Sequence, residues 1–258
     1  MEFGFTEQQE ILRDQVRRLL ADVCPPDYVE HCDRDGVPPT EAYAAMGEHG
    51  WLGLMMPEEY GGAGGSPVEV AILLEEAGRA YEELGVWMFR SMVWGGHSLT
   101  LHGTDAQKAA YLPKIASGQS SVCFGLTEPD SGSDAAALKT FAEKQADGSY
   151  VINGQKMFTS GMDISDYCLL VARTSHQERK QQGITTFFID TKTPGIEVRK
   201  IETLGHRGIG TTQVFYTDVH VPADAVLGEA DNGWAATDLY LWYERPCLSA
   251  ARYGAASA

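Results

Sequence analysis

The hydrophobic pattern of the chain changes its period twice, near residue 121 and again after Pro222, and this constrains the fold more than any other feature. Before residue 121 the apolar residues recur at helical spacing. Beyond it they alternate along short segments joined by turns without intervening helices, which indicates an antiparallel barrel or sandwich. After Pro222 the helical pattern returns. The sequence therefore predicts an α+β fold in three parts: an N-terminal all-α helical domain (residues 1–120), a middle antiparallel β-barrel or sandwich domain (residues 121–231) and a further helix (residues 232–258).

Two capping boxes predict helix starts in the first part of the chain. Thr6 is followed three residues later by Gln9, and Ser66 by Glu69, with Pro67 at the first helical position of the second helix. In such a box the hydroxyl and the later side chain each satisfy a backbone N–H that the helix leaves free. Both segments are therefore expected to begin helices.

Proline and glycine predict where other elements end. A helix that starts at Asp105 should extend through Tyr111 and end before Pro113, because proline cannot donate a helical hydrogen bond. In the β domain, Asp147-Gly148 and Asn153-Gly154 flank a short predicted strand. Asn-Gly is the strongest short signal for a hairpin, so a turn is expected at that pair.

Charge and residue spacing restrict the environment and the partners of the protein. Asp and Glu total 36 against 20 Lys and Arg, so the formal net charge is −16. Such a chain repels phosphate backbones and anionic lipids, which argues against nucleic acid and membranes as partners.

The sequence has no C-x-x-C pair, H-x-x-H spacing, signal peptide or apolar stretch of membrane length. We therefore expect no metal site and a location in the reducing cytoplasm.

The last residues, Ala255 to Ala258, contain no glycine cap and no helix breaker. A helix needs to bury its apolar stripe against another element, and no further helix follows this one in the sequence. The pattern therefore predicts a truncated chain whose last helix has an unpartnered apolar face.

Four short motifs point to a known family. They are GLTEPDSGSDAAA at residues 125–137, PEEYGG at 57–62, NGQKMFTSG at 153–161 and VHVP at 219–222. The first closely resembles the flavin-binding signature of acyl-CoA dehydrogenases, and the others follow in that family's order along the whole chain. The resemblance implies an N-terminal helical domain, a middle β-domain and a C-terminal helical bundle, of which this chain would hold the first two and the start of the third.

The resemblance also implies FAD as the cofactor and a set of residues that bind it. The Thr127 hydroxyl and backbone amide would meet polar atoms of the flavin, and the small residues of the following turn let backbone donors approach a ligand closely. A polar turn beside a core aromatic is the alternative interpretation. The contacts implied for the flavin or the thioester are Phe124, Leu126, Thr127, Gly132 and Ser133, with Phe158, Thr159 and Ser160 against the isoalloxazine.

Glu244 is the candidate catalytic base. Dehydrogenation of an acyl thioester requires a carboxylate to remove the α-proton while the β-hydrogen leaves as hydride. Glu244-Arg245 matches the position of the base in a branch that resembles isovaleryl- and long-chain acyl-CoA dehydrogenases. In the other branch the base lies in the C-terminal bundle, beyond residue 258. Arg245 matches an arginine near the CoA moiety, and a guanidinium suits that oxygen-rich ligand. A solvated helix residue is the alternative for Glu244.

One departure from the family bears on the substrate. Trp242 stands where the family commonly has an aspartate that holds the pantetheine, which puts the usual grip on CoA in doubt. Arg90 and Trp94 fall where the acyl pocket is often lined, which favours a polar or short acyl group.

The resulting prediction is an FAD-dependent acyl-CoA dehydrogenase of fatty acid metabolism. Its full-length form would be a homodimer or homotetramer that passes electrons to electron-transfer flavoprotein. Two alternatives stay open: a non-catalytic subunit that serves assembly, and a flavin-dependent oxidase or reductase of the same superfamily.

Overall fold

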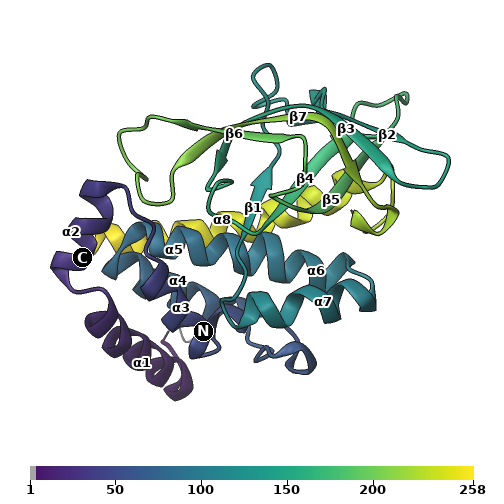
Figure 1. Cartoon of the computed structure of the whole chain (residues 1–258). Coiled ribbons are helices and arrows are strands. Elements are labelled where there is room, and N and C mark those ends of the chain that lie inside the picture. Colours follow the sequence, from purple (N-terminus) through teal and green to yellow (C-terminus); the bar gives the residue numbers. More distant parts are fainter. Residues whose placement is uncertain (1–3) are drawn as a thin grey trace.

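The computed structural model describes residues 4–258, and all side chains in that range except those of residues 238–240. Figure 1 shows a helical layer beneath a β-sheet, and the last helix, in yellow, lies where the two layers meet. The predicted order is confirmed: a helical domain, a β domain and a further helix.

The helical layer is built from the first half of the chain. Its α-helices are α1 (Glu7–Val23), α2 (Pro26–Asp35), α3 (Thr40–Glu48), α4 (Pro67–Ala80), α5 (Glu82–Phe89), α6 (Ser98–His102) and α7 (Asp105–Ala116). Both predicted capping boxes are present. The Gln9 amide donates to Thr6 Oγ1 at 3.3 Å, and the Ser66 amide donates to the Glu69 carboxylate at 2.8 Å.

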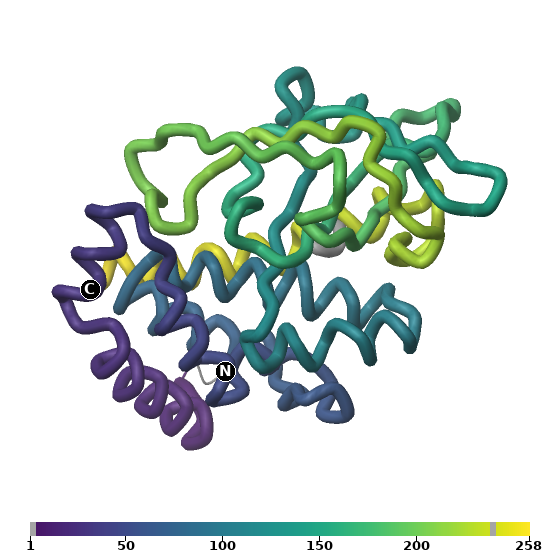
Figure 2. Tube along the Cα trace, viewed as in Figure 1, coloured from purple at the N-terminus to yellow at the C-terminus, as the bar shows by residue number. Residues whose placement is uncertain are grey.

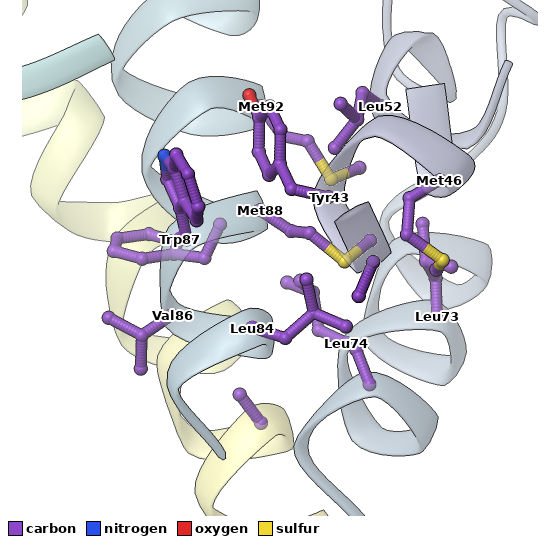
Figure 3. Packing of buried hydrophobic residues seen from close by; sticks show 14 of the residues in the cluster. Tyr43, Met46, Leu52, Leu73, Leu74, Leu84, Val86, Trp87, Met88 and Met92 are labelled. Atoms are coloured by element: carbon purple, nitrogen blue, oxygen red, sulfur yellow. The ribbon is translucent and has the colours of Figure 1, made fainter. Parts of the chain in front are cut away.

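Buried apolar side chains of α3, α4 and α5 form the core of this layer, as Figure 3 shows. Tyr43 and Trp87 stack at its centre, with ring centroids 4.4 Å apart. Met46, Leu73 and Met88 are fully buried around them. Burial of each such side chain contributes about 1.5–3 kcal/mol, so this cluster holds the helices together.

The predicted end of α7 before Pro113 is wrong, because the helix continues to Ala116. An interior proline removes one helical hydrogen bond and costs about 3 kcal/mol. Leu112 and Ile115, on either side of Pro113, are fully buried in an apolar cluster. Their burial contributes about 1.5–3 kcal/mol each, which offsets the cost of the proline.

The β domain is one eight-stranded sheet. Its strands are β1 (Val122–Gly125), β2 (Phe141–Lys144), β3 (Tyr150–Ser160), β4 (Tyr167–Arg173), β5 (Ile184–Asp190), β6 (Ile196–Ile201), β7 (Thr211–Val221) and β8 (Val226–Leu227). The order is β6-β7-β3-β2-β4-β5-β8, with β1 paired to β4. Most pairs are antiparallel as predicted, but β1 and β2 both pair with β4 in parallel, so the sheet is mixed. Both faces of β1 are covered, because Val122 and its neighbour Cys123 are fully buried.

Asn153-Gly154 is not a hairpin turn. Strand β3 continues through it, and the pair forms an irregularity in the ladder with β7. Asn153 holds this bulge by donating to Asp218 Oδ1 at 3.1 Å and accepting from the Asp218 amide at 2.9 Å. A Cβ at Gly154 would lie 2.6 Å from Thr140 Cα, so glycine is required for close packing. The chain reverses at the other predicted pair, where Gly148 has a φ of 89°.

The last helix, α8 (Gly233–Ala256), packs on α4 and α5, so the prediction that it has no partner within the chain is wrong, while Trp242 and Tyr253 on it are exposed. A Cβ at Gly78 of α4 would lie 1.9 Å from the Ala251 carbonyl oxygen, and one at Gly254 would lie 1.9 Å from that of Glu75. The two backbones approach closely because these residues lack side chains. In Figure 2 the yellow end of the tube returns to the helical layer, where Arg79 donates a hydrogen bond to the Ser257 carbonyl at 2.5 Å.

Within the part of the chain that the structure describes, no helix combines the length and the apolar character that crossing a membrane requires.

Candidate functional site

A pocket of about 230 Å³ lies where β1, the end of β3 and α8 come together. Seven residues predicted from the sequence line it, and two further residues complete its wall. The predicted ones are Phe124, Leu126, Thr127, Phe158, Ser160, Glu244 and, for the acyl group, Trp94, and the others are Met157 and Leu241. Segments far apart in the sequence therefore meet at one site.

Four predicted residues lie outside the lining of this pocket. Gly132 and Ser133 are exposed on the loop that follows β1, and Arg245 is exposed on α8. Thr159 is buried, and its Oγ1 atom has no hydrogen-bond partner among the described residues. The structure thus places these four residues outside the wall of the pocket. Gly132, Ser133 and Arg245 could contact only a ligand that extends beyond it.

A buried ion pair fixes the segment that carries Thr127. Lys156 Nζ lies 2.8 Å from Glu128 Oε1 and donates to the Leu126 carbonyl at 2.9 Å. Burial alone would raise the pKa of Glu128, but Lys156 and the hydrogen-bond donors around the carboxylate outweigh burial and lower it. The Met157 amide donates to the Thr127 carbonyl at 2.8 Å. The sequence did not predict the ion pair between Lys156 and Glu128, although both residues lie in the recognised motifs.

Phe158 has an unusual backbone and an unusual exposure. Its φ is 58°, and it lies at an irregularity between Lys156 and Thr159 in the pairing of β3 with β7. A left-handed conformation costs a non-glycine residue about 1–2 kcal/mol. The bulge turns the side chain into the pocket, where 62% of it is exposed. Strain of this kind clusters at ligand sites, so the exposed ring is a candidate contact for a ligand.

Glu244 projects from α8 into the same pocket. Burial raises the pKa of its carboxyl, and a hydrogen bond from Trp94 and the charge of Arg245 partly oppose that effect. The Trp94 Nε1–H donates to Glu244 Oε2 at 3.1 Å. A partly desolvated carboxylate is a stronger base than one in water, which suits it for proton transfer.

Of the two residues expected around an acyl group, only Trp94 lines the pocket. Arg90 is fully buried and donates to Ser165 Oγ at 3.1 Å. Its burial lowers the pKa of the guanidinium. Arg90 packs against the backbone of Gly161 rather than facing the cavity.

The donors and the rings of the pocket fit a flavin better than a metal ion. The described residues contain no group of three His, Cys, Asp or Glu side chains that could hold a metal. The exposed Phe158 ring offers a face for a planar heterocycle, and Thr127 and Ser160 bring hydroxyl groups beside it. The unpartnered Thr159 Oγ1 is a further buried polar atom close to this wall. These residues are compatible with an isoalloxazine ring.

Comparisons with known proteins identify the family of the chain. Residues 6–119 match the family model "Acyl-CoA dehydrogenase, N-terminal domain", and residues 123–219 match "Acyl-CoA dehydrogenase, middle domain". Acyl-CoA dehydrogenase FadE29 of Mycobacterium tuberculosis is 35% identical over 255 residues, which cover 97% of this chain and 64% of the relative. The 3-(aryl)acrylate reductase of Clostridium sporogenes is 34% identical, over 98% of this chain and 67% of the relative.

The fold is shared with a solved structure, that of butyryl-CoA dehydrogenase from Megasphaera elsdenii. The TM-score is 0.92 at 28% identity, and the match covers 98% of this chain and 67% of that one. The chain thus spans about two thirds of the length of the proteins that it matches. Sequence, family models and fold agree, and the chain belongs to the acyl-CoA dehydrogenase family.

Proposed function

We propose that the protein is an FAD-dependent enzyme that removes hydrogen from Cα and Cβ of an acyl-CoA thioester, with Glu244 as the base. The observation that carries this proposal is the carboxylate of Glu244. It lines the same pocket as the exposed Phe158 ring and Thr127, and burial raises its pKa.

Phe158, Thr127 and Ser160 would hold the flavin ring, because they line the pocket. Family resemblance adds Phe124, Leu126, Gly132, Ser133 and Thr159. Bound FAD supplies the acceptor for the hydride that leaves Cβ. Ser133 and Arg245 are exposed and would meet the thioester end and the CoA moiety of the substrate.

Glu244 performs the proton transfer. The Cα–H bond breaks, its proton goes to a carboxylate oxygen of Glu244, and the electron pair forms the new double bond as the β-hydrogen departs with its own pair. The apolar surroundings favour the neutral acid that results, because they disfavour the charged form. The pocket therefore helps the carboxylate to accept the proton.

A reductase is the second candidate. The Clostridium sporogenes relative carries that name, and the same residues could work in reverse, with protonated Glu244 delivering a proton to Cα. Electron-transfer flavoprotein as partner, a homodimer or homotetramer, and a cytoplasmic location complete the proposal. Supplying the protein with an acyl-CoA or its unsaturated product, together with oxidised or reduced flavin, distinguishes the two directions.

The test compares Glu244→Gln with Glu178→Gln, a control on an exposed loop. Purified protein should be yellow, whereas a non-catalytic subunit without flavin would be colourless. Anaerobic bleaching of the flavin by saturating acyl-CoA should slow by about 10²–10⁴-fold in Glu244→Gln and stay unchanged in Glu178→Gln. Bleaching of Glu244→Gln at the wild-type rate would show that another residue is the base. Hydrogen peroxide release in air would identify an oxidase.

A further inference from the structure

Trp94 makes the only hydrogen bond to the Glu244 carboxylate among the described residues. Its Nε1–H donates to Oε2, which leaves Oε1 without a hydrogen-bond partner in the described part of the chain. The indole N–H can only donate, so this contact is made with whichever oxygen carries no proton. The two residues are 150 positions apart in the sequence and line the same pocket.

The backbone around Trp94 is shaped to bring the indole to that place. Trp94 lies in a π-helical segment, Arg90–His97, an irregularity that is frequent at functional sites. The two glycines that follow it allow close packing: a Cβ at Gly95 would lie 2.6 Å from Val122 Cγ2, and one at Gly96 would lie 2.1 Å from Met56 Cε.

Aromatic neighbours fix the orientation of the ring. The Trp94 ring centroid lies 5.0 Å from that of Phe89, edge to face, and 5.1 Å from that of Phe124. A second contact joins the π-helical segment to α8. The His97 ring lies 4.0 Å from the ring of Tyr243, the neighbour of Glu244. The indole is thus packed against two rings and cannot turn away without loss of that packing.

Few charges compete with Trp94 at this carboxylate. Arg245 on the same helix lowers the pKa of Glu244, whereas burial lowers the pKa of His97 to about 4, so its ring is neutral near pH 7. Arg90 of the same segment is turned toward Ser165. The charged groups of the other elements packed on α8 lie toward the two ends of that helix. Near its C-terminal end, around Arg252 and Ser257, they are Glu75, Glu76, Arg79 and Glu82. Near its N-terminal end, His102 lies beside Gly228.

From this arrangement we infer that Trp94 is a positioning residue, which holds Oε2 of Glu244 so that Oε1 is the oxygen that meets the substrate. The inference rests on the proposed role of Glu244. A carboxylate held by one oxygen loses less rotational freedom when the substrate arrives, and a small error in orientation lowers a rate strongly. The N–H also favours the ionised carboxylate, which keeps the base free of its proton at lower pH.

The contact can be tested without any turnover. The sequence has five tryptophans, and the indole N–H signal of Trp94 in a ¹H–¹⁵N spectrum is the one that Trp94→Phe removes. It should move with pH as Glu244 titrates, with a midpoint above the ordinary value of 4.5. In Glu244→Gln that movement should vanish. An indole signal that ignores pH, or that titrates equally in Glu244→Gln, would overturn the inference.

Trp94→Phe keeps an aromatic ring in the wall and removes only the N–H. We expect the Glu244 carboxyl, followed by ¹³C, to titrate about one pH unit higher, because a hydrogen bond to the charged form is lost. The low-pH limb of kcat/KM should move by the same amount, and kcat should fall about tenfold with a smaller change in KM. Trp51→Phe is the matched control, because Trp51 lies beside His49, away from the pocket.

The outcomes separate the two proposals. If Glu244→Gln is inactive while Trp94→Phe leaves the titration, the pH profile and kcat unchanged, the proposed function stands and the inference about Trp94 is wrong. If Glu244→Gln keeps the wild-type rate, both are wrong, whatever the indole signal shows. Unfolding of Trp94→Phe would not protect the inference, because the wild type must still show an indole signal whose movement with pH vanishes in Glu244→Gln.

Discussion

The ammonium group of Lys156 lies 2.8 Å from the carboxylate of Glu128, and both side chains are almost completely shielded from solvent. Glu128 also accepts hydrogen bonds from the Lys139 amide at 2.6 Å and the Thr140 amide at 2.9 Å. The pair therefore joins both ends of the loop between β1 and β2 to strand β3. Removing one charge would leave the other buried and unpaired.

Lys156→Met should therefore destabilise the protein by about 3–5 kcal/mol, as loss of one partner of a buried ion pair does. Urea unfolding measures this change. Lys180→Met is the control, because its pair with Asp134 is about half exposed and should contribute at most about 1 kcal/mol. The double variant Lys156→Met/Glu128→Gln should recover part of the loss. Equal effects of the two single lysine variants would contradict this account.

Glu244→Gln should make the protein more stable above the ordinary pKa of glutamate. Burial raises the pKa of Glu244, so the folded state binds more protons than the unfolded state between the two pKa values. Stability therefore falls as pH rises through that interval, and it stays lower at neutral pH. The glutamine has no charge to desolvate, and we expect a gain of about 0.5 kcal/mol at pH 7. Urea midpoints at pH 4 and pH 7 test this: the gain should vanish at pH 4.

Gly78→Ala should separate α4 from α8. The added Cβ would lie 1.9 Å from the Ala251 carbonyl oxygen, and a backbone atom cannot move aside without shifting its helix. We expect a loss of about 1–3 kcal/mol in unfolding free energy, although alanine is the better helix former. Gly205→Ala is the matched control, because a Cβ there meets nothing within 4 Å. A neutral Gly78→Ala would contradict the observed closeness of the two helices.

Phe158→Ala and Phe158→Gly should both weaken flavin retention but differ in stability. Both remove the exposed ring that lines the pocket. Only glycine adopts the φ of 58° without strain, so Phe158→Gly should be more stable than Phe158→Ala by about 1 kcal/mol. Fluorescence titration with FAD and thermal melts of the cofactor-free proteins measure the two effects. Wild-type affinity in both variants would exclude the ring from the flavin site.

Local patterns predicted most of the elements because they depend on near neighbours. Thr6 and Ser66 cap helices with residues three positions away, and Asp147-Gly148 marks the turn before β3. The errors have a different origin. Pro113 stays within a helix, and Asn153 within a strand, because contacts with distant residues outweigh the local preference for a break.

In the candidate site, too, local motifs predicted single residues but not the contacts between distant ones. Motifs drew attention to Phe124, Thr127 and Glu244, and the structure brings these residues to one pocket. The hydrogen bond from Trp94 to Glu244 could not be predicted, because it joins residues 150 positions apart on elements whose packing no local pattern specifies. Lys156 and Glu128 stand within recognised motifs, yet their pairing depends on the register of β3 beside the loop after β1.

The wide spacing of the pocket residues has a consequence for how the protein reaches its native state. The wall of the pocket comes from four separate segments: Trp94, residues 124–127, residues 157–160 and α8. Their contacts cannot nucleate folding locally, because bringing any two of these segments together costs the entropy of closing a long loop. The helices and hairpins can form earlier, because their contacts are local. During refolding, we therefore expect helical circular dichroism to recover before the proposed binding of FAD, because that binding needs all four segments of the pocket in place.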